Sequence, residues 1–233
     1  MGLCVVLSAC GGSSGAVARD TQSASIKTAS PAEGPASATD SGGTPGRKTV
    51  LFLGTSLTAG YGLEPDSAFP QQLQRKIDAA GLPYQTVNAG VSGETSAGLL
   101  RRLDWVLQRP ADVFVVETGA NDGLRGQPVA GTQATIGQIL DRIHRERPDA
   151  RLVLVQMEAP TNLGARYTSA FRAMFPALAR EHGATLIPFL LDSVAGRPAL
   201  NQADGIHPNY AGERIVTENV WRGLEGVLRG GER

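Results

Sequence analysis

The chain has no excess of charge of either sign, no long hydrophobic run and almost no cysteine. Lysine plus arginine and aspartate plus glutamate each number 22, so the charge gives no indication of a nucleic acid or an anionic membrane as partner. No apolar run approaches the ~20 residues that a membrane-spanning helix needs. The hydrophobic content of 41% is ordinary for a globular α/β protein.

Both cysteines, Cys4 and Cys10, lie in the first ten residues, so a disulfide or a metal site built on this pair is not expected. The segment Leu7-Ser8-Ala9-Cys10 resembles a bacterial lipobox, in which the cysteine is lipidated and becomes the mature N-terminus. Residues 3–7 then represent the remnant of an apolar signal core, although no basic residue precedes it. An ordinary signal peptide, cleaved or truncated, and a cytoplasmic chain are the alternatives.

The next segment, residues 11–46, consists mostly of Gly, Ser, Ala, Thr and Pro and has hardly any large apolar residue. Such a composition predicts a disordered tether. We therefore divide the chain into a signal remnant (1–10), a linker (11–46) and one globular domain (47–233). The domain is expected to be exported to the periplasm. Alternatively, a lipid on Cys10 anchors the domain to a membrane. The outer membrane is expected in that case, since Gly11 rather than Asp follows the cysteine.

From residue 48 onward, strand-like apolar runs alternate with segments of helical periodicity. This alternation predicts a parallel sheet covered by helices on both faces. Pro176 is expected to break or kink the helix that contains it. The expected strands are residues 49–53, 85–88, 112–116, 152–155 and 185–187, and the expected helices are residues 67–80, 96–108, 132–147, 165–181 and 209–228.

Four short motifs carry the candidate chemistry. Three follow the first three predicted strands, whose carboxyl ends meet at one edge if the strand order is 2-1-3-4-5. Together the motifs supply a hydroxyl, a backbone N–H, a side-chain amide and an Asp–His pair, which suffice to activate a nucleophile and to stabilise an oxyanion. The motifs are Gly54-Thr55-Ser56-Leu57-Thr58, Asn88-Ala89-Gly90, Gly119-Ala120-Asn121-Asp122 and Asp204-Gly205-Ile206-His207-Pro208-Asn209.

The Asp204–His207 pair is the most specific of these signals. At a spacing of three residues on a tight turn, the carboxylate can accept the Nδ1–H of the imidazole and leave Nε2 free to take a proton from Ser56. Pro208 is expected at the first position of the final helix. The two other histidines, His144 and His182, lie in charged stretches and are predicted to be solvated surface residues.

Each remaining motif residue has a simpler structural interpretation. Ser56 could cap a helix, Gly90 could be a turn glycine, and Asn121 could stabilise its own loop. Asp122 is expected to support the loop and to take no part in the chemistry.

With these residues in place, the chain resembles the SGNH hydrolases, also called GDSL esterases, over residues 48–228. Ser56, Gly90, Asn121 and His207 match the four-residue signature, and the longer matching stretches are residues 90–96, 119–126 and 204–209. The resemblance is closest to the bacterial exported thioesterase, lysophospholipase and arylesterase subgroup. One departure is Thr55, which stands where the motif that names the family has Asp and which leaves a hydroxyl able to bond the loop.

The resemblance implies a flavodoxin-like three-layer α/β/α fold whose five parallel strands have the order 2-1-3-4-5. It further implies a serine esterase with no metal or organic cofactor. Ser56, Asp204 and His207 would form the catalytic triad, and the oxyanion hole would consist of the N–H groups of Ser56 and Gly90 and the side chain of Asn121.

The substrate is expected to be a short- to medium-chain acyl ester or thioester. Leu124, Met157 and Leu163 are predicted to line an open, shallow, apolar groove formed by loops at residues 93–98, 124–129 and 157–164. A monomer is expected. The alternatives are a carbohydrate O-deacetylase of the same superfamily and a non-catalytic flavodoxin-like binding lipoprotein.

Overall fold

A computed structural model describes residues 46–230. The predicted signal remnant, Cys10 with its predicted lipid and nearly all of the predicted linker lie outside the described residues and stay predictions. Among residues 46–230, none of the helices combines the length and the apolar character needed to cross a membrane.

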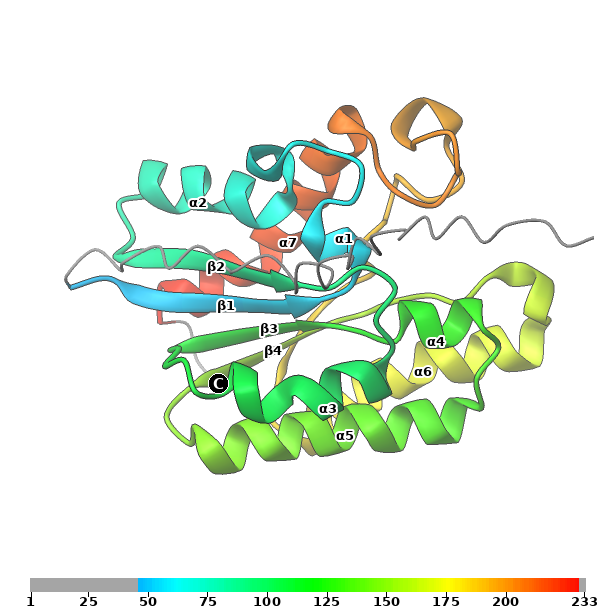
Figure 1. The fold of residues 1–233 in the computed structure, drawn as a ribbon, viewed down its shortest axis with the longest axis horizontal. Helices are drawn as coiled ribbons and strands as arrows, with labels where there is room; N and C mark the ends of the chain where they lie inside the picture. Colours follow the sequence, from blue (N-terminus) through cyan, green and yellow to red (C-terminus); the bar gives the residue numbers. More distant parts are fainter. Residues whose placement is uncertain (1–45, 231–233) are drawn as a thin grey trace, which may run out of the picture. The chain divides into compact units, whose positions relative to one another are not determined.

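Five parallel strands form one sheet in the order β2-β1-β3-β4-β5. This confirms the predicted sheet and its strand order. The carboxyl ends of β1, β2 and β3 point the same way and end beside one another, next to α1 and α4 (Figure 1). The strands are β1 (Lys48–Gly54), β2 (Tyr84–Gly90), β3 (Val113–Glu117), β4 (Arg151–Val155) and β5 (Thr185–Ile187).

Helices cover both faces of the sheet and make three layers (Figure 1). α2 and α7 lie on one face, and α3, α5 and α6 lie on the other. The α-helices are α1 (Ser56–Ala59), α2 (Phe69–Ala79), α3 (Ser96–Val106), α4 (Ala120–Leu124), α5 (Val129–Glu146), α6 (Ala165–Glu181) and α7 (Tyr210–Leu228), and the 3-10 helices are η1 (Pro65–Ser67), η2 (Thr161–Leu163) and η3 (Pro198–Leu200).

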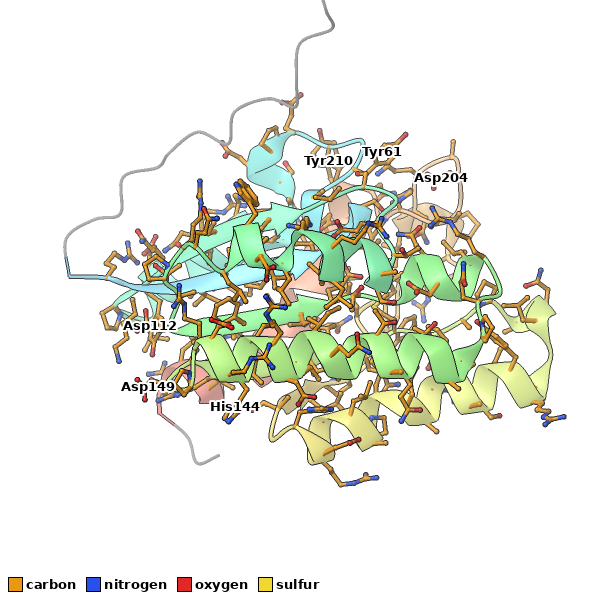
Figure 2. All side chains as sticks on the ribbon, turned by 60° about the horizontal axis from the view of Figure 1, so that its bottom comes forward. Tyr61, Asp112, His144, Asp149, Asp204 and Tyr210 are labelled. Atoms are coloured by element: carbon orange, nitrogen blue, oxygen red, sulfur yellow. The ribbon has the colours of Figure 1, made fainter. Side chains whose placement is uncertain are left out.

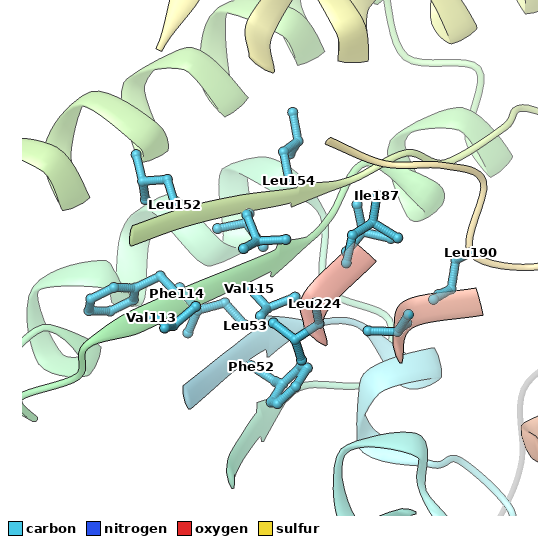
Figure 3. Packing of buried hydrophobic residues seen from close by; sticks show 14 of the residues in the cluster. Phe52, Leu53, Val113, Phe114, Val115, Leu152, Leu154, Ile187, Leu190 and Leu224 are labelled. Atoms are coloured by element: carbon cyan, nitrogen blue, oxygen red, sulfur yellow. The ribbon is translucent and has the colours of Figure 1, made fainter. Parts of the chain in front are cut away.

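The core lies on both sides of the central strands. Every residue of β3 is buried, which explains why this strand has an unbroken apolar run where a half-exposed strand would alternate. Phe52 and Leu53 of β1, Phe114 of β3 and Leu154 of β4 belong to the same buried cluster (Figure 3). Rigid packing at the centre of the sheet therefore fixes the strand ends on which the candidate motifs lie.

Helix α6 and strand β2 differ from the sequence prediction in ways that matter for the fold and the site. Pro176 does not end its helix, because α6 continues through it from Ala165 to Glu181. Phe171, Phe175 and Leu178 on the same helix are buried, so tertiary packing outweighs the backbone hydrogen bond that proline removes. Strand β2 runs two residues beyond its predicted end, since Gly90 still pairs with Gly54 of β1.

Candidate active site

Ser56 follows β1 directly and is the first residue of α1. The preceding residue, Thr55, caps this helix, and its hydroxyl accepts a hydrogen bond from the N–H of Leu57. Thr55, Leu57 and Thr58 are buried, whereas Ser56 is only half-buried. The hydroxyl of Ser56 is therefore accessible on a segment whose other side chains are anchored in the interior.

The anchor of this segment is Glu117, a residue that the sequence reasoning missed. Its carboxyl group lies at the end of β3 and accepts the N–H of Thr55 at 2.8 Å. The hydroxyls of Thr55 and Thr58 also hydrogen-bond to it, at 2.9 and 3.0 Å. An acidic residue that closes an otherwise apolar central strand was the available signal, because a buried carboxyl group needs partners.

Burial also changes the protonation of Glu117. The side chain is 1% exposed, and desolvation raises its pKa to about 7, although the hydrogen bonds from Thr55 and Thr58 act in the opposite direction. Below that pH the group is a neutral acid that can both donate to and accept from the two threonine hydroxyls. Thr55, which replaces the Asp of the family motif, therefore still bonds this region through its hydroxyl, as predicted.

The Asp204–His207 turn has the predicted geometry. Asp204 Oδ2 lies 2.7 Å from His207 Nδ1, and His207 Nε2 lies 2.8 Å from Ser56 Oγ. The other oxygen, Asp204 Oδ1, accepts the backbone N–H groups of Ile206 and His207 at 2.9 and 3.0 Å. The carboxylate thus fixes both the fold of the turn and the orientation of the ring.

The hydrogen bond to the His207 side chain, followed by the two backbone hydrogen bonds, lowers the pKa of Asp204 to about 2. Asp204 is therefore ionised at neutral pH. An ionised acceptor at Nδ1 favours the tautomer that carries the proton there and leaves Nε2 as the acceptor for the Ser56 hydroxyl.

The final helix begins slightly later than predicted. Pro208 is not its first residue, because Asn209 caps the helix by accepting the N–H groups of Ala211 and Gly212, and α7 starts at Tyr210. An Asn side chain satisfies two free helix N–H groups at the cap position, and so the proline falls just outside the helix.

Asn121 and Asp122 lie in the first turn of α4, which follows β3. The Asn121 side-chain amide donates to the carbonyl of Glu94 at 3.0 Å, which leaves its second N–H for a ligand. Asp122 is buried and accepts the N–H and the hydroxyl of Ser96 at 2.8 and 2.6 Å. Asp122 therefore holds the start of α3, in agreement with its predicted supporting role.

The prediction that Gly90 presents a free backbone N–H to the oxyanion is wrong. Its N–H is not accessible to a substrate, because it donates to the side-chain oxygen of Asn88 at 2.9 Å. The cause is the extra length of β2, which places Gly90 in the sheet and moves the loop onward in the sequence. The Val91 N–H is also occupied, by Gly54 O at 2.8 Å, and the Glu94 N–H donates to Val91 O at 3.2 Å.

Gly93, three residues further on, has the free N–H that was predicted for Gly90. Among the described contacts, the N–H groups of Ser92, Gly93 and Thr95 are the ones in this loop with no intramolecular acceptor. Gly93 has a positive φ of 76° and is exposed, and open space surrounds the position of its missing side chain. Asn121 binds the carbonyl of the adjacent Glu94, so the Gly93 N–H belongs to the same small region.

The three predicted substrate contacts have different environments. Leu124 is 47% exposed, and Leu163 is partly buried against the core. Met157 is 2% exposed and belongs to the hydrophobic core, so its predicted position on the rim is wrong. An apolar residue directly after a central strand packs inward in this fold, and periodicity could not separate that outcome from a position on the rim.

The other histidines do not join the site. His144 is exposed and lies at the opposite end of the domain from Asp204 (Figure 2). His182 is not the solvated residue that was predicted, because its side chain is only 9% exposed and its Nδ1 lies 2.8 Å from Asp141 Oδ1. Within residues 46–230, no group of three His, Cys, Asp or Glu side chains is placed to hold a metal ion.

Comparison with known proteins supports the predicted resemblance. The model of the GDSL-like Lipase/Acylhydrolase family matches residues 52–215. Esterase TesA of Pseudomonas aeruginosa is 38% identical over 183 residues, which cover 78% of this chain and 90% of that protein. Thioesterase 1/protease 1/lysophospholipase L1 of Escherichia coli K12 is 39% identical over 181 residues, which cover 77% of this chain and 85% of that protein.

A solved structure of an esterase is also similar to this chain. The crystal structure of the psychrotrophic esterase EstA from Pseudoalteromonas sp., inhibited by monoethylphosphonate, superposes with a TM-score of 0.74 at 34% identity. The match covers 78% of this chain and 99% of that one. The family match and these similarities extend over most of the described domain, and the chain therefore belongs to the GDSL-like lipase/acylhydrolase family.

Proposed function

We propose that Ser56 is the nucleophile, His207 the general base and Asp204 the orienting carboxylate of this carboxylic ester hydrolase. The observation that carries the proposal is the continuous chain from Asp204 Oδ2 to His207 Nδ1 at 2.7 Å and from His207 Nε2 to Ser56 Oγ at 2.8 Å. Both distances are suitable for proton transfer without rearrangement.

The reaction follows from this chain of contacts. His207 Nε2 takes the hydroxyl proton while Ser56 Oγ bonds to the carbonyl carbon of the ester or thioester. The tetrahedral intermediate then loses its alkoxide or thiolate, which His207 protonates. Water attacks the acyl-enzyme as it gives a proton to the same nitrogen; the Ser56–acyl bond then breaks, His207 returns that proton to Ser56 Oγ, and the carboxylic acid leaves.

Three donors are available for the oxyanion. Ser56 is the first residue of α1, where helix geometry leaves its N–H without an intrahelical acceptor. The second N–H of Asn121 and the N–H of Gly93 complete the set, with Gly93 in place of Gly90. Loss of one such donor typically costs 10²–10³ in kcat, or about 3–4 kcal/mol, and Asn121→Ala is the variant that measures it.

The proposed substrates are short- to medium-chain acyl esters and thioesters. The names of the two curated relatives, an esterase and a thioesterase/lysophospholipase, support this class. Leu124 and Val91 are large apolar side chains left exposed on the segments that follow β3 and β2. Such surface favours an acyl chain over a polar sugar.

The location of the protein is a separate proposal. We propose export, with Cys10 as the lipidated residue, a tether through residues 11–46 and a monomeric hydrolase domain at the membrane surface. The native chain should then partition into detergent, and Cys10→Ser should release it or block its processing. Partitioning of the wild-type chain into the aqueous phase would contradict the anchor and leave the hydrolase assignment intact.

A fluorophosphonate label tests the chemistry directly. The wild-type protein should be labelled and Ser56→Ala should not, with Asp122→Asn as a buried acidic control that keeps the nucleophile. An ester series from acetate to palmitate, assayed beside acetylated xylan, then defines the substrate class. Turnover of simple esters by Ser56→Ala would overturn the nucleophile assignment, and activity confined to the acetylated glycan would favour an O-deacetylase.

A further inference from the structure

Tyr61 lies against the ring of His207. The two ring centroids are 4.7 Å apart at an interplanar angle of 42°, and the Tyr61 side chain nevertheless remains 53% exposed. One face of the Tyr61 ring is therefore packed against His207, and the rest of the ring is open to a ligand. Tyr61 and Asp204 lie at the same end of the domain (Figure 2).

The backbone of Tyr61 is held by both halves of the site. Its N–H donates to Ser56 O at 3.0 Å, which ties it to the nucleophile segment. Its carbonyl accepts the side-chain amide of Gln202 at 2.7 Å, and the same amide donates to Pro208 O at 3.0 Å. The Gln202 N–H also donates to His207 O at 2.7 Å, so Gln202 joins the Tyr61 segment to the turn that carries the base.

Gly62 makes this junction possible. It has a φ of 76°, and a side-chain carbon added to it would come within 2.2 Å of the Gln202 amide oxygen. A residue larger than glycine would displace Gln202 from its hydrogen bonds. The backbone that carries the Tyr61 ring is thus held by two hydrogen bonds of its own, and two more join Gln202 to the turn of His207.

This position has a consequence for the leaving group. His207 Nε2 must come within hydrogen-bond reach of the departing oxygen or sulfur in order to protonate it. The group attached to that atom must therefore pass beside the His207 ring, where Tyr61 presents an open aromatic face. The acyl chain extends from the other side of the carbonyl carbon.

From this geometry we propose that Tyr61 is a specificity-determining residue that binds the leaving group and selects flat aromatic alcohols over saturated ones of equal size. The inference rests on the proposed function, because it takes Ser56 as nucleophile and His207 as the acid that protonates the leaving group. An offset pair of aromatic rings binds more strongly than the same buried apolar area without a second aromatic ring. A saturated ring cannot form such a pair with Tyr61.

Benzyl acetate and cyclohexylmethyl acetate are suitable probes, because they share the acyl group, the ring size and the primary-alcohol leaving group. We expect wild-type kcat/KM to favour the benzyl ester. Tyr61→Leu, which keeps apolar bulk but removes the aromatic face, should lower the benzyl-to-cyclohexylmethyl ratio by about 2- to 12-fold, the range of one aromatic pair. Tyr61→Phe should retain the wild-type ratio, since the hydroxyl takes no part.

Tyr210→Leu is the matched control. Tyr210 is as exposed as Tyr61, at 54%, and Figure 2 places it at the same end of the domain. The benzyl-to-cyclohexylmethyl ratio of kcat/KM in Tyr210→Leu should equal that of the wild type. An unchanged ratio in Tyr61→Leu, or an equal loss of activity on both esters, would overturn the inference and reduce Tyr61 to a support for His207. Hydrolysis of both esters by Ser56→Ala would instead refute the proposed function, so the two failures are distinguishable.

Discussion

The proposed nucleophile, Ser56, and the proposed base, His207, are held by opposite means. The segment around Ser56 is anchored in the protein interior. Thr55, Leu57 and Thr58 are buried, and the hydroxyls of Thr55 and Thr58 hydrogen-bond to Glu117. The turn from Asp204 to His207 is exposed for most of its length and is held by its own hydrogen bonds and by Gln202. One half of the site is therefore part of the core, and the other half is a surface loop with a rigid internal structure.

The two carboxyl groups show the same contrast in their protonation. Burial raises the pKa of Glu117 to about 7, whereas the hydrogen bond to the His207 side chain lowers the pKa of Asp204 to about 2. Substitutions in the buried half should therefore reduce stability first and activity as a result. Substitutions in the exposed half should reduce activity with little change in stability.

The largest expected effect is in the exposed half. Asp204→Asn should lower kcat by about 10³- to 10⁴-fold, because an amide favours the wrong imidazole tautomer. The free energy of unfolding should fall by only about 1 kcal/mol, because the Asn side-chain oxygen can still accept the backbone N–H groups of Ile206 and His207. Ester turnover and urea denaturation measure the two quantities, and Asp149→Asn, at the other end of the domain (Figure 2), is the control. A large loss of stability in Asp204→Asn would contradict the contrast.

Substitutions in the buried half, around Glu117, should reduce stability more than activity. Glu117→Leu leaves the Thr55 N–H and the Thr58 hydroxyl without their acceptor and should lower the free energy of unfolding by about 3 kcal/mol. Glu117→Gln keeps an acceptor and a donor at the same place and should stay within about 1 kcal/mol of the wild type. Chemical denaturation at pH 5, where the acid is neutral, compares the pair. Equal stability of the two variants would show that these hydrogen bonds do not anchor the segment.

The pH dependence of stability sharpens the comparison. The pKa of Glu117 is about 7 in the folded protein and 4.5 in the unfolded chain. Between these two pH values the native protein therefore retains a proton that the unfolded chain has released. The stabilisation is complete below pH 4.5 and is lost as the pH rises through 7, by about 3 kcal/mol. Glu213 adds to the same trend, since burial raises its pKa to about 8. Denaturation midpoints between pH 4.5 and 7 should fall more steeply in the wild type than in Glu117→Gln, and parallel curves would refute the assignment.

A smaller effect is expected at Gln202. Gln202→Leu removes the two side-chain hydrogen bonds that join Tyr61 O and Pro208 O but keeps the backbone bond to His207. Because the base turn keeps its internal bonds to Asp204, kcat/KM should fall by only about 10-fold, with unchanged stability. Steady-state kinetics and thermal unfolding test this, with Gln127→Leu as an exposed control. A loss as large as that in Asp204→Asn would mean that the turn has little rigidity of its own.

The smallest effect concerns the acyl chain. Each buried methylene contributes about 0.8 kcal/mol, so preference along an ester series should rise gradually. Leu124→Ala should flatten that rise without affecting acetate esters. Relative kcat/KM from acetate to octanoate measures the slope, and Trp105→Ala, an exposed aromatic residue on α3, is the control. A sharp cut-off at one chain length would contradict an open groove.

The sequence was sufficient for the parallel sheet and for the contact between Asp204 and His207, because both follow from local patterns: alternating apolar runs and a three-residue spacing. The strand order came from the resemblance to the family. The sequence was insufficient where tertiary context decides. Gly90 was placed in a loop because the apolar run seemed to end at Asn88, but pairing with β1 extends the strand. Glu117 was overlooked because its partners, Thr55 and Thr58, lie about 60 positions away. Met157 could not be separated from a rim residue by hydrophobicity alone.

The hydrogen bond between Ser56 and His207 joins residues 151 positions apart. A ribosome that adds roughly 5–20 residues per second needs roughly 8–30 s to travel from one to the other. Throughout that interval the proposed nucleophile exists without its proposed base. Synthesis must therefore reach His207, near the end of the 233-residue polypeptide, before the proposed pair of nucleophile and base can form. A chain that terminates before residue 207 should lack esterase activity.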